Sequence, residues 1–195
     1  MNIQDLIMKQ LANPEVLEQL GKTVGAKPEQ VQKAAQLGLP TLLEALNRNA
    51  GTPQGAQALA GALEQHQDAK VDDLSGFLQN VDMQDGAKIL QHVLSGNSGR
   101  VQNNLARQTG LEGSQVSGLL QQFAPLLLGM LGNKKKEQNL DAAGVAGLTS
   151  QLTNTLGGSG GGGLMGLASQ FLDADKDGDI VDDLGKLLGG FMGKK

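Results

Sequence analysis

Apolar residues recur along most of the chain every three or four positions, the spacing that places side chains on one face of an α-helix. Helix starts are marked as well. Asn13 stands before Pro14 and Thr52 before Pro53, so that a capping side chain precedes a proline suited to the first helical turn. No segment shows a sustained alternation of apolar and polar residues rich in Val, Ile and Thr, as a strand would. The pattern predicts an all-α protein.

The sequence also contains an internal repeat. Residues 16–46 align without gaps with residues 101–131, at an offset of 85 positions, and the matches include a glycine, a proline and several leucines. Two unrelated leucine-rich helices could align in this way by chance, but we favour a duplication. The identical pairs are Val16/Val101, Leu20/Leu105, Gly25/Gly110, Gln30/Gln115, Val31/Val116, Gln36/Gln121, Pro40/Pro125, Leu42/Leu127, Leu43/Leu128 and Leu46/Leu131.

The repeated unit has a physical interpretation. A helix is expected to end near Gly25 and near Gly110, because a residue without a Cβ atom readily adopts the left-handed conformation of a helix cap. A second helix is expected to begin near Pro28 and near Gly113. Each unit is therefore predicted to contain two helices that meet at a glycine turn.

Within each second helix stands a proline, Pro40 or Pro125. We expect the chain to bend or restart there, because proline lacks a backbone donor and clashes with the preceding turn. The whole chain is then a multi-helical bundle of two tandem similar helical units, followed by a C-terminal helix-loop-helix tail. The predicted divisions are 1–156 for the duplicated domain (units about 1–80 and 81–156), 157–163 for a Gly-rich linker and 164–195 for the tail.

At this point the sequence resembles a known family. The run "LGKTVGAKPEQVQKAAQLGLPTLLEALNRNAGTPQGAQAL" (20–59) is similar to the YidB-like bacterial proteins, catalogued as domain of unknown function 937, and "LARQTGLEGSQVSGLLQQFAPLLLGML" (105–131) is similar to them again. The Asp/Gly-rich tail also suits that group. The resemblance implies an all-helical fold and brings no established activity, so no catalytic residues are carried over.

Composition narrows the function classes. The chain has no Cys, which removes disulfides, thiolate catalysis and Cys-ligated zinc and fits a reducing compartment. A net charge of −4 and a pI near 5.1 do not provide the basic surface that nucleic-acid binding requires. The longest nearly apolar run, 123–132, is about half the length of a membrane span. With no signal-peptide pattern at the start, we expect a cytoplasmic protein without a membrane span.

Three other features are weak as functional sites. The segment 20–39 has the glycine turn of a helix-turn-helix, which would need Lys or Arg on its second helix to bind DNA. The first copy offers Lys27 and Lys33 there and the second copy, "GLEGSQVSGLLQQF", no cation, so helix packing is the preferred interpretation. His66 is expected to be solvated near a helix end, and His92 to lie on a helix surface or at a packing boundary. The run of lysines at 134–136 is expected to be a solvated helix end or loop.

The most specific chemistry lies in "DADKDGDIVDD" (173–183). An EF-hand loop places oxygen ligands at positions 1, 3 and 5, a glycine at 6, a backbone carbonyl at 7 and a bidentate acid at 12. Counting from the first aspartate, Gly178 occupies position 6, and Leu184, which cannot bind a cation, occupies position 12. The predicted calcium ligands are the side chains of Asp173, Asp175 and Asp177, the Asp179 carbonyl and, in a shortened loop, Asp183 or Asp182.

An unliganded acidic turn is the alternative to a calcium loop. The sequence "VDDL" at 181–184 also occurs at 71–74, where no DxDxDG precedes it. Asp72 and Asp73 are expected in the first turn of a helix, where negative charge is favourable, and Asp182 and Asp183 could serve only that purpose. Apolar residues at helical spacing flank the loop on both sides. A tail of about 32 residues is below the usual size of an independent core, so it should dock on the bundle, pair with another copy or depend on metal.

These observations favour a non-enzymatic helical protein that serves interaction or assembly and carries a weak Ca²⁺ site. A protein partner or self-association is expected, and nucleic acid is not. Two alternatives remain open: a DNA-binding regulator that uses the segment 20–39, and an enzyme with a site that the sequence does not reveal.

Overall fold

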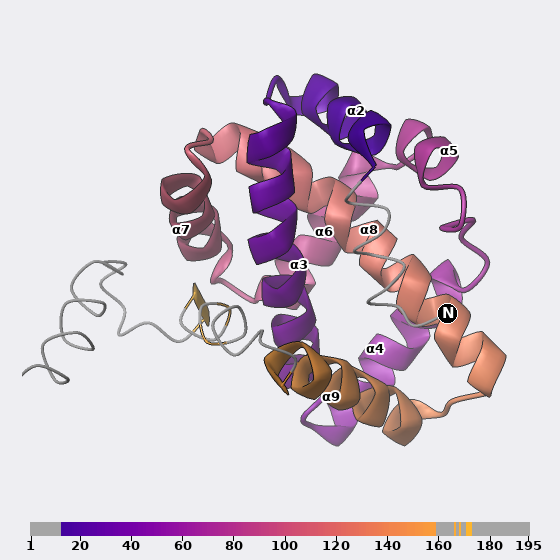
Figure 1. Ribbon diagram of the computed structural model, residues 1–195. Helices are drawn as coiled ribbons and strands as arrows, with labels where there is room; N and C mark the ends of the chain where they lie inside the picture. Colours follow the sequence, from indigo (N-terminus) through magenta and orange to yellow (C-terminus); the bar gives the residue numbers. More distant parts are fainter. Residues whose placement is uncertain (1–12, 159–165, 167, 169–170, 173–195) are drawn as a thin grey trace, which may run out of the picture.

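The computed structural model describes residues 13–158, 166, 168, 171 and 172, and these residues are arranged as an all-α protein (Figure 1). The fold class predicted from the hydrophobic pattern is confirmed, since no strand occurs among the described residues. Residues 13–158 form the helices α2 (Pro14–Val24), α3 (Pro28–Asn49), α4 (Pro53–His66), α5 (Leu74–Gln79), α6 (Met83–Leu94), α7 (Ser98–Thr109), α8 (Gly113–Gln138) and α9 (Ala142–Gly158).

Several helix ends are those that the sequence predicts. The Asn13 side chain accepts a hydrogen bond from the Glu15 backbone N–H at the start of α2, and Thr52 accepts one from Gly55 at the start of α4. Gly25 and Gly110, both at φ +71°, are the left-handed C-caps of α2 and α7. These caps satisfy backbone groups that a helix end would otherwise leave unpaired.

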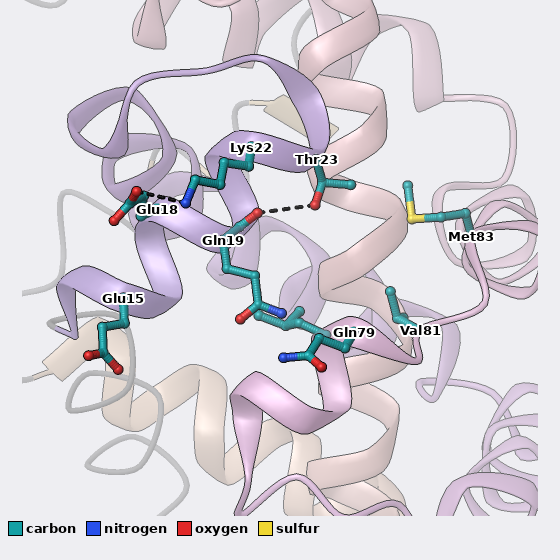
Figure 2. A pocket seen from close by; sticks show the side chains of 9 residues that line it. Glu15, Glu18, Gln19, Lys22, Thr23, Gln79, Val81 and Met83 are labelled. Atoms are coloured by element: carbon teal, nitrogen blue, oxygen red, sulfur yellow. Dashed lines mark hydrogen bonds and ion pairs between the residues drawn. The ribbon is translucent and has the colours of Figure 1, made fainter.

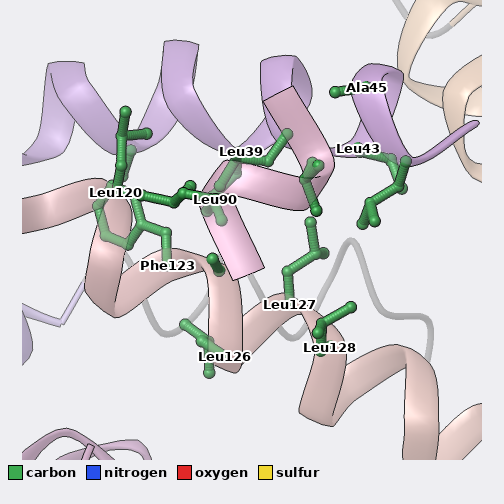
Figure 3. Close-up of a cluster of buried hydrophobic side chains, with 14 of the residues drawn as sticks. Leu39, Leu43, Ala45, Leu90, Leu120, Phe123, Leu126, Leu127 and Leu128 are labelled. Carbon is green, nitrogen blue, oxygen red and sulfur yellow. The ribbon is translucent and has the colours of Figure 1, made fainter. Parts of the chain in front are cut away.

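The core is built around α3 and α8, which cross in the middle of the molecule (Figure 1). Gly38 brings the two helices close together: a Cβ atom on it would lie 3.3 Å from Cδ2 of Leu120 and 3.7 Å from Cδ2 of Phe123. Figure 3 shows Phe123 and leucines of α8 facing leucines of α3, with Leu90 of α6 beside them. Phe123 is completely buried.

The chain was expected to bend or restart at the two prolines, and the restart is wrong. α3 continues through Pro40 and α8 through Pro125, and both prolines are buried. Proline removes one hydrogen bond from a helix, but apolar residues on either side of each proline lie in the core, and their burial holds the backbone helical. Next to Pro40, the hydroxyl of the buried Thr41 donates to the Leu37 carbonyl over 2.7 Å, so this polar side chain is paired within its own helix.

The remaining helices cover this central pair. α6 and α4 pack against α8, and α9 packs against α3 and α4, while α2 and α7 each contact both α3 and α8. α6 approaches α8 most closely at Gly86, where a Cβ atom would lie 1.9 Å from the Gln121 carbonyl oxygen. That carbonyl lies one turn before Pro125, and proline has no backbone N–H to donate to it. The α6 backbone therefore packs against the part of α8 in which proline removes a helical hydrogen bond.

The two glycine turns are joined to each other. The Nε2 atom of Gln115 donates to the Gly25 carbonyl over 2.7 Å, and Nε2 of Gln30 donates to the Gly110 carbonyl over 3.0 Å. The Oε1 atom of each glutamine accepts from the N-cap backbone of its own helix, Lys27 or Glu112. Each glutamine therefore caps its own helix and also binds the turn of the other repeat.

The helix order is the same in both repeated segments: a helix, a left-handed glycine, a capping box and a long helix with an internal proline. That each segment belongs to a complete tandem unit, with the boundaries predicted above, stays a prediction. α9 extends to Gly158, two residues into the predicted linker.

We predict opposite effects of alanine at two helical glycines. Gly86→Ala should lower the free energy of unfolding by about 1–3 kcal/mol, because the new methyl group meets the α8 backbone, which cannot move aside as a side chain could. Gly61→Ala, in α4, has open space around its Cβ position and should raise the stability by about 0.5–1 kcal/mol. Urea unfolding followed by circular dichroism measures both. Equal midpoints for the two variants would contradict the close packing of α6 on α8.

A second prediction concerns the glutamines. Gln30→Ala and Gln115→Ala should each lower the free energy of unfolding by about 0.5–1.5 kcal/mol or somewhat more, since each removes a bond between the turns and half of a capping box. Gln32→Ala, at an exposed position of α3, is the matched control and should change little. If all three variants unfold at the same urea concentration, the bonds between the turns contribute nothing.

Candidate functional site

The residues predicted to bind calcium, Asp173, Asp175, Asp177, Asp179 and Asp183, lie outside the described residues. The helical residues immediately before them are described and deeply buried. Ala168 and Phe171 are 0% exposed and Leu172 is 7% exposed, and both Phe171 and Leu172 belong to the main hydrophobic core. The tail was expected to dock on the bundle, pair with another copy or depend on metal, and two of its described residues, Phe171 and Leu172, pack in the core of the bundle.

In the sequence, the predicted acidic loop follows this docked segment directly. Asp173 is bonded to Leu172, so its Cα atom is one peptide unit, about 3.8 Å, from the Cα atom of a buried residue. Burying a Phe or Leu side chain contributes roughly 1.5–3 kcal/mol. The candidate site is therefore continuous with the folded domain at its N-terminal side.

The "VDDL" sequence at 71–74 lies within the described residues and shows the role of its aspartates. Asp73 is the N-cap of α5, and its Oδ1 accepts from the Gly76 backbone N–H over 3.0 Å. Asp72 precedes the cap, so the expectation that both aspartates lie in the first helical turn is wrong: α5 begins at Leu74, after both of them. Capping satisfies a backbone donor with the side-chain oxygen, whereas a first-turn acid acts mainly through its charge.

His66 is more enclosed than the sequence predicts. It is the last residue of α4, its side chain is 18% exposed, and it contacts two acceptors: Nδ1 lies 2.9 Å from the Ala62 carbonyl and Nε2 lies 3.1 Å from Oδ2 of Asp85 in α6. A carbonyl and a carboxylate can only accept, so both contacts are hydrogen bonds only when both ring nitrogens carry a proton. His66 and Asp85 thus form an ion pair between α4 and α6 in the imidazolium form.

His92 lies on a helix surface, one of the two positions expected for it. Its Nδ1 atom is 2.8 Å from the Lys88 carbonyl one turn earlier, and the residue is exposed. Neither histidine is part of a larger cluster, since no group of three or more His, Cys, Asp or Glu side chains among the described residues is arranged to hold a metal ion. The described part of the chain thus adds no metal site to the one predicted from the sequence.

A surface cleft of about 680 Å³ lies between α2 and the segment that joins α5 to α6 (Figure 2). Its α2 side is polar and its opposite side includes Leu78, Val81 and Met83. Lys22 donates to the Glu18 carboxylate over 2.8 Å, and this hydrogen bond, together with the lysine charge, lowers the pKa of Glu18. The pair is exposed, so the cleft has mixed polarity and no buried charged group that would select a ligand.

The helix-turn-helix-like segment is part of the core. Its second helix, α3, packs against six other helices, and Val31, Ala34 and Ala35 are buried on it. Lys27 and Lys33 are exposed, and Glu29 is exposed between them. A DNA-recognition helix presents a face to the major groove, whereas the apolar face of α3 is used for packing.

The lysines at 134–136 lie in the last turns of α8, at a helix end as expected, and all three form ion pairs with acids. Lys136 is exposed, whereas the side chains of Lys134 and Lys135 are largely covered. Lys135 contacts Glu64 of α4 over 2.8 Å, Lys136 contacts Asp68, and Lys134 contacts Glu137. Hydrogen bonding with Lys134, together with its charge, lowers the pKa of the Glu137 carboxyl. Two of these pairs join α8 to the end of α4.

One buried polar side chain was not anticipated in the sequence analysis. Asn104 of α7 is 0% exposed, and neither its Oδ1 nor its Nδ2 atom has a hydrogen-bond partner among the described residues. At the corresponding position of the first repeat, Gln19 donates to the Ser75 carbonyl over 3.1 Å. The repeats differ here because α5 packs against α2, and the helices found to pack against α7 are α3, α6 and α8.

Comparison with known protein families gives a match over most of the chain. A family model described as a bacterial protein of unknown function, DUF937, matches residues 5–134. No curated protein and no solved structure matches the chain. Among the described helices, none combines the length and the apolar character needed to cross a bilayer.

The contact between His66 and Asp85 generates a prediction. A double-mutant cycle with His66→Ala, Asp85→Ala and both together should give a coupling free energy of about 0.5–1.5 kcal/mol, because the Nε2–Oδ2 contact joins α4 to α6 at a histidine side chain that is only 18% exposed. Urea unfolding of the wild type and the three variants measures it.

His92→Ala combined with Asp85→Ala is the matched control, and no coupling is expected there. A coupling of zero for His66 and Asp85 would show that their contact contributes nothing to stability.

Proposed function

The chain belongs to the DUF937 family of bacterial proteins of unknown function, and we propose that it is a non-enzymatic interaction or assembly module whose C-terminal loop binds calcium weakly. The observation that carries the proposal is the ligand pattern of residues 173–179, which directly follows two residues of the core. The family assigns no activity, so the proposal depends on the chemistry of this chain.

The first half of the loop supports calcium. Asp173, Asp175 and Asp177 supply carboxylates at the first three ligand positions, Gly178 allows the turn, and Asp179 supplies a backbone carbonyl. Hard oxygen ligands of this kind suit Ca²⁺. Several carboxylates held close together repel one another, and a divalent cation removes that repulsion. Magnesium should compete poorly, because an incomplete, adaptable cage does not enforce its compact octahedron.

The second half of the loop limits the affinity. Leu184 replaces the bidentate acid, and the described copy of "VDDL" supports a capping role for the aspartate that precedes this leucine. By analogy with Asp73, Asp183 would cap a helix that begins at Leu184, which competes with its use as a ligand. We therefore expect a dissociation constant toward the weak end of the EF-hand range, about 10⁻⁴–10⁻³ M.

The incomplete ligand set also supports an interaction role. Calcium takes six to eight oxygen ligands, and the loop offers fewer. Water fills the remaining positions in the isolated protein, and a carboxylate from a protein partner or a second copy would bind there more tightly. Calcium would then strengthen assembly by presenting an open coordination position.

Calcium titration of the full chain by isothermal calorimetry tests this proposal. The wild type should bind one calcium ion in the millimolar to submillimolar range, and Asp173→Ala with Asp175→Ala should abolish the heat of binding. Glu15→Gln with Glu29→Gln removes the same charge from exposed positions of α2 and α3 and should bind normally. No heat and no spectral change for the wild type at millimolar calcium would leave only an acidic turn.

Asp183 has its own test. Asn retains the capping oxygen and loses the charge, so Asp183→Asn should leave calcium affinity nearly unchanged if the residue only caps. A loss of tenfold or more would identify Asp183 as a calcium ligand, and the same substitution at Asp182 then serves as the comparison.

A further inference from the structure

We propose that α7 is a lid that opens away from the molecule while the helices around it stay folded. The helices that pack against α7 include α3, α6 and α8, and α7 lies to one side of the central pair (Figure 1). The proposal goes beyond the interaction and calcium-binding function and does not rest on it. Three features of α7 support it: its buried face, its N-terminal end and the turns on either side.

The buried face of α7 opposes its own docking. Val101 and Leu105 are the buried apolar residues of this helix, and Asn104, on the same face, is also 0% exposed. Neither amide atom of Asn104 has a partner among the described residues. A buried amide in this situation has lost its hydrogen bonds to water and has gained none in exchange. Opening of α7 restores those bonds, which shifts the equilibrium toward the open state.

The corresponding helix of the first repeat, α2, does not have this weakness. At the offset of 85 positions, Leu17 corresponds to Gln102 and Gln19 corresponds to Asn104. Leu17 is 7% exposed, whereas Gln102 is half-buried. The amide of Gln19 donates to the Ser75 carbonyl over 3.1 Å. α2 therefore buries an additional apolar side chain and pairs the amide that α7 leaves unpaired.

The N-terminal end of α7 is also less firmly held than that of α2. Asn97 is the N-cap of α7, but its side chain makes no capping hydrogen bond, and the first turn contains no acid. At the start of α2, the Asn13 side chain accepts from the Glu15 N–H, and Pro14 occupies the first helical position. A side-chain cap and a first-turn acid both stabilise a helix end. α7 has neither.

Left-handed residues on both sides of α7 provide hinges. Ser95, the C-cap of α6, has φ +42°, and Gly96 has φ +89° with open space around its Cβ position. On the other side, Gly110 has φ +71°, and its carbonyl accepts from the Gln30 side chain. Hinges of domains and lids are a few loop or helix-end residues of this kind. Because the second turn is bonded to α3, we expect α7 to open from its N-terminal end and pivot about Gly110.

The helices that precede and follow α7 in the chain are held by contacts that do not involve it. α6 packs closely against the α8 backbone at Gly86, and α8 packs against α3 through the completely buried Phe123. Opening of α7 leaves both contacts in place. It is therefore a local transition that exposes less surface than unfolding of the whole molecule.

Native-state hydrogen exchange of the full chain, followed by NMR at increasing urea concentration, tests the lid. The protection factor of the Leu105 amide should be at least about tenfold lower than that of Leu20, its counterpart in α2. Its urea dependence should be shallower than that of global unfolding, because less surface is exposed. Equal protection of the two amides, or exchange of Leu105 through global unfolding alone, would overturn the proposal.

Substitution of the buried amide tests the cause. Asn104→Leu retains the approximate size of the side chain and removes the unpaired groups, so the Leu105 protection factor should rise about tenfold or more. The Leu20 protection factor should not change. Asn103→Leu makes the same chemical change at an exposed position of α7 and should alter protection by only about twofold, through helix propensity. Equal effects of the two variants, or an equal rise at Leu20, would contradict the role of Asn104.

The absence of Cys from the chain allows an independent measurement. Val101→Cys and Val16→Cys each introduce a single thiol at equivalent positions that are 0% and 1% exposed. Without denaturant, a maleimide reagent should label the Val101→Cys protein at least about tenfold faster, because local opening exposes its thiol. If Asn104→Leu does not fold, this comparison still decides. Equal labelling rates would show that α7 is held as firmly as α2 and would exclude a lid.

Discussion

The close contact between α3 and α8 is the constraint on which the rest of the structure depends. Gly38 allows Leu120 and Phe123 to approach the α3 backbone, and no larger residue would leave the same space. The chain has only four Phe and no Trp or Tyr, so most of its core must be filled by aliphatic side chains on helices that lie close together. With these two helices fixed, α2 and α7 can each pack on both of them, and α4, α6 and α9 cover their remaining surfaces.

Much of this fold could be predicted from local chemistry. Asn13, Thr52, Gly25 and Gly110 mark helix ends through interactions within a few residues, and the structure places each of them at the expected cap. The prolines led to a wrong prediction, because their local cost is opposed by burial along the whole of α3 and α8. Tertiary packing of this kind is not visible in a short window of sequence.

The contacts that sequence reasoning missed join distant segments. His66 and Asp85 belong to different helices, and nothing near either residue indicates the other. Gln30 and Gln115 gave a signal that could have been used: they are identical in the repeats and follow the glycine turns closely. The docking of Phe171 and Leu172 was one of three possibilities, since apolar spacing indicates a buried face without identifying what covers it. The calcium ligands themselves remain a prediction from their spacing.

The bonds between the glycine turns have a consequence for symmetry. Gln30 donates to the glycine turn that precedes Gln115, and Gln115 donates to the glycine turn that precedes Gln30. Each side therefore presents the same donor and the same acceptor. This reciprocity is the defining property of an isologous interface, in which one surface recognises an identical copy of itself through a two-fold axis. The two glutamine–carbonyl bonds within this single chain therefore have the reciprocal form of such an interface, with both halves supplied by one polypeptide.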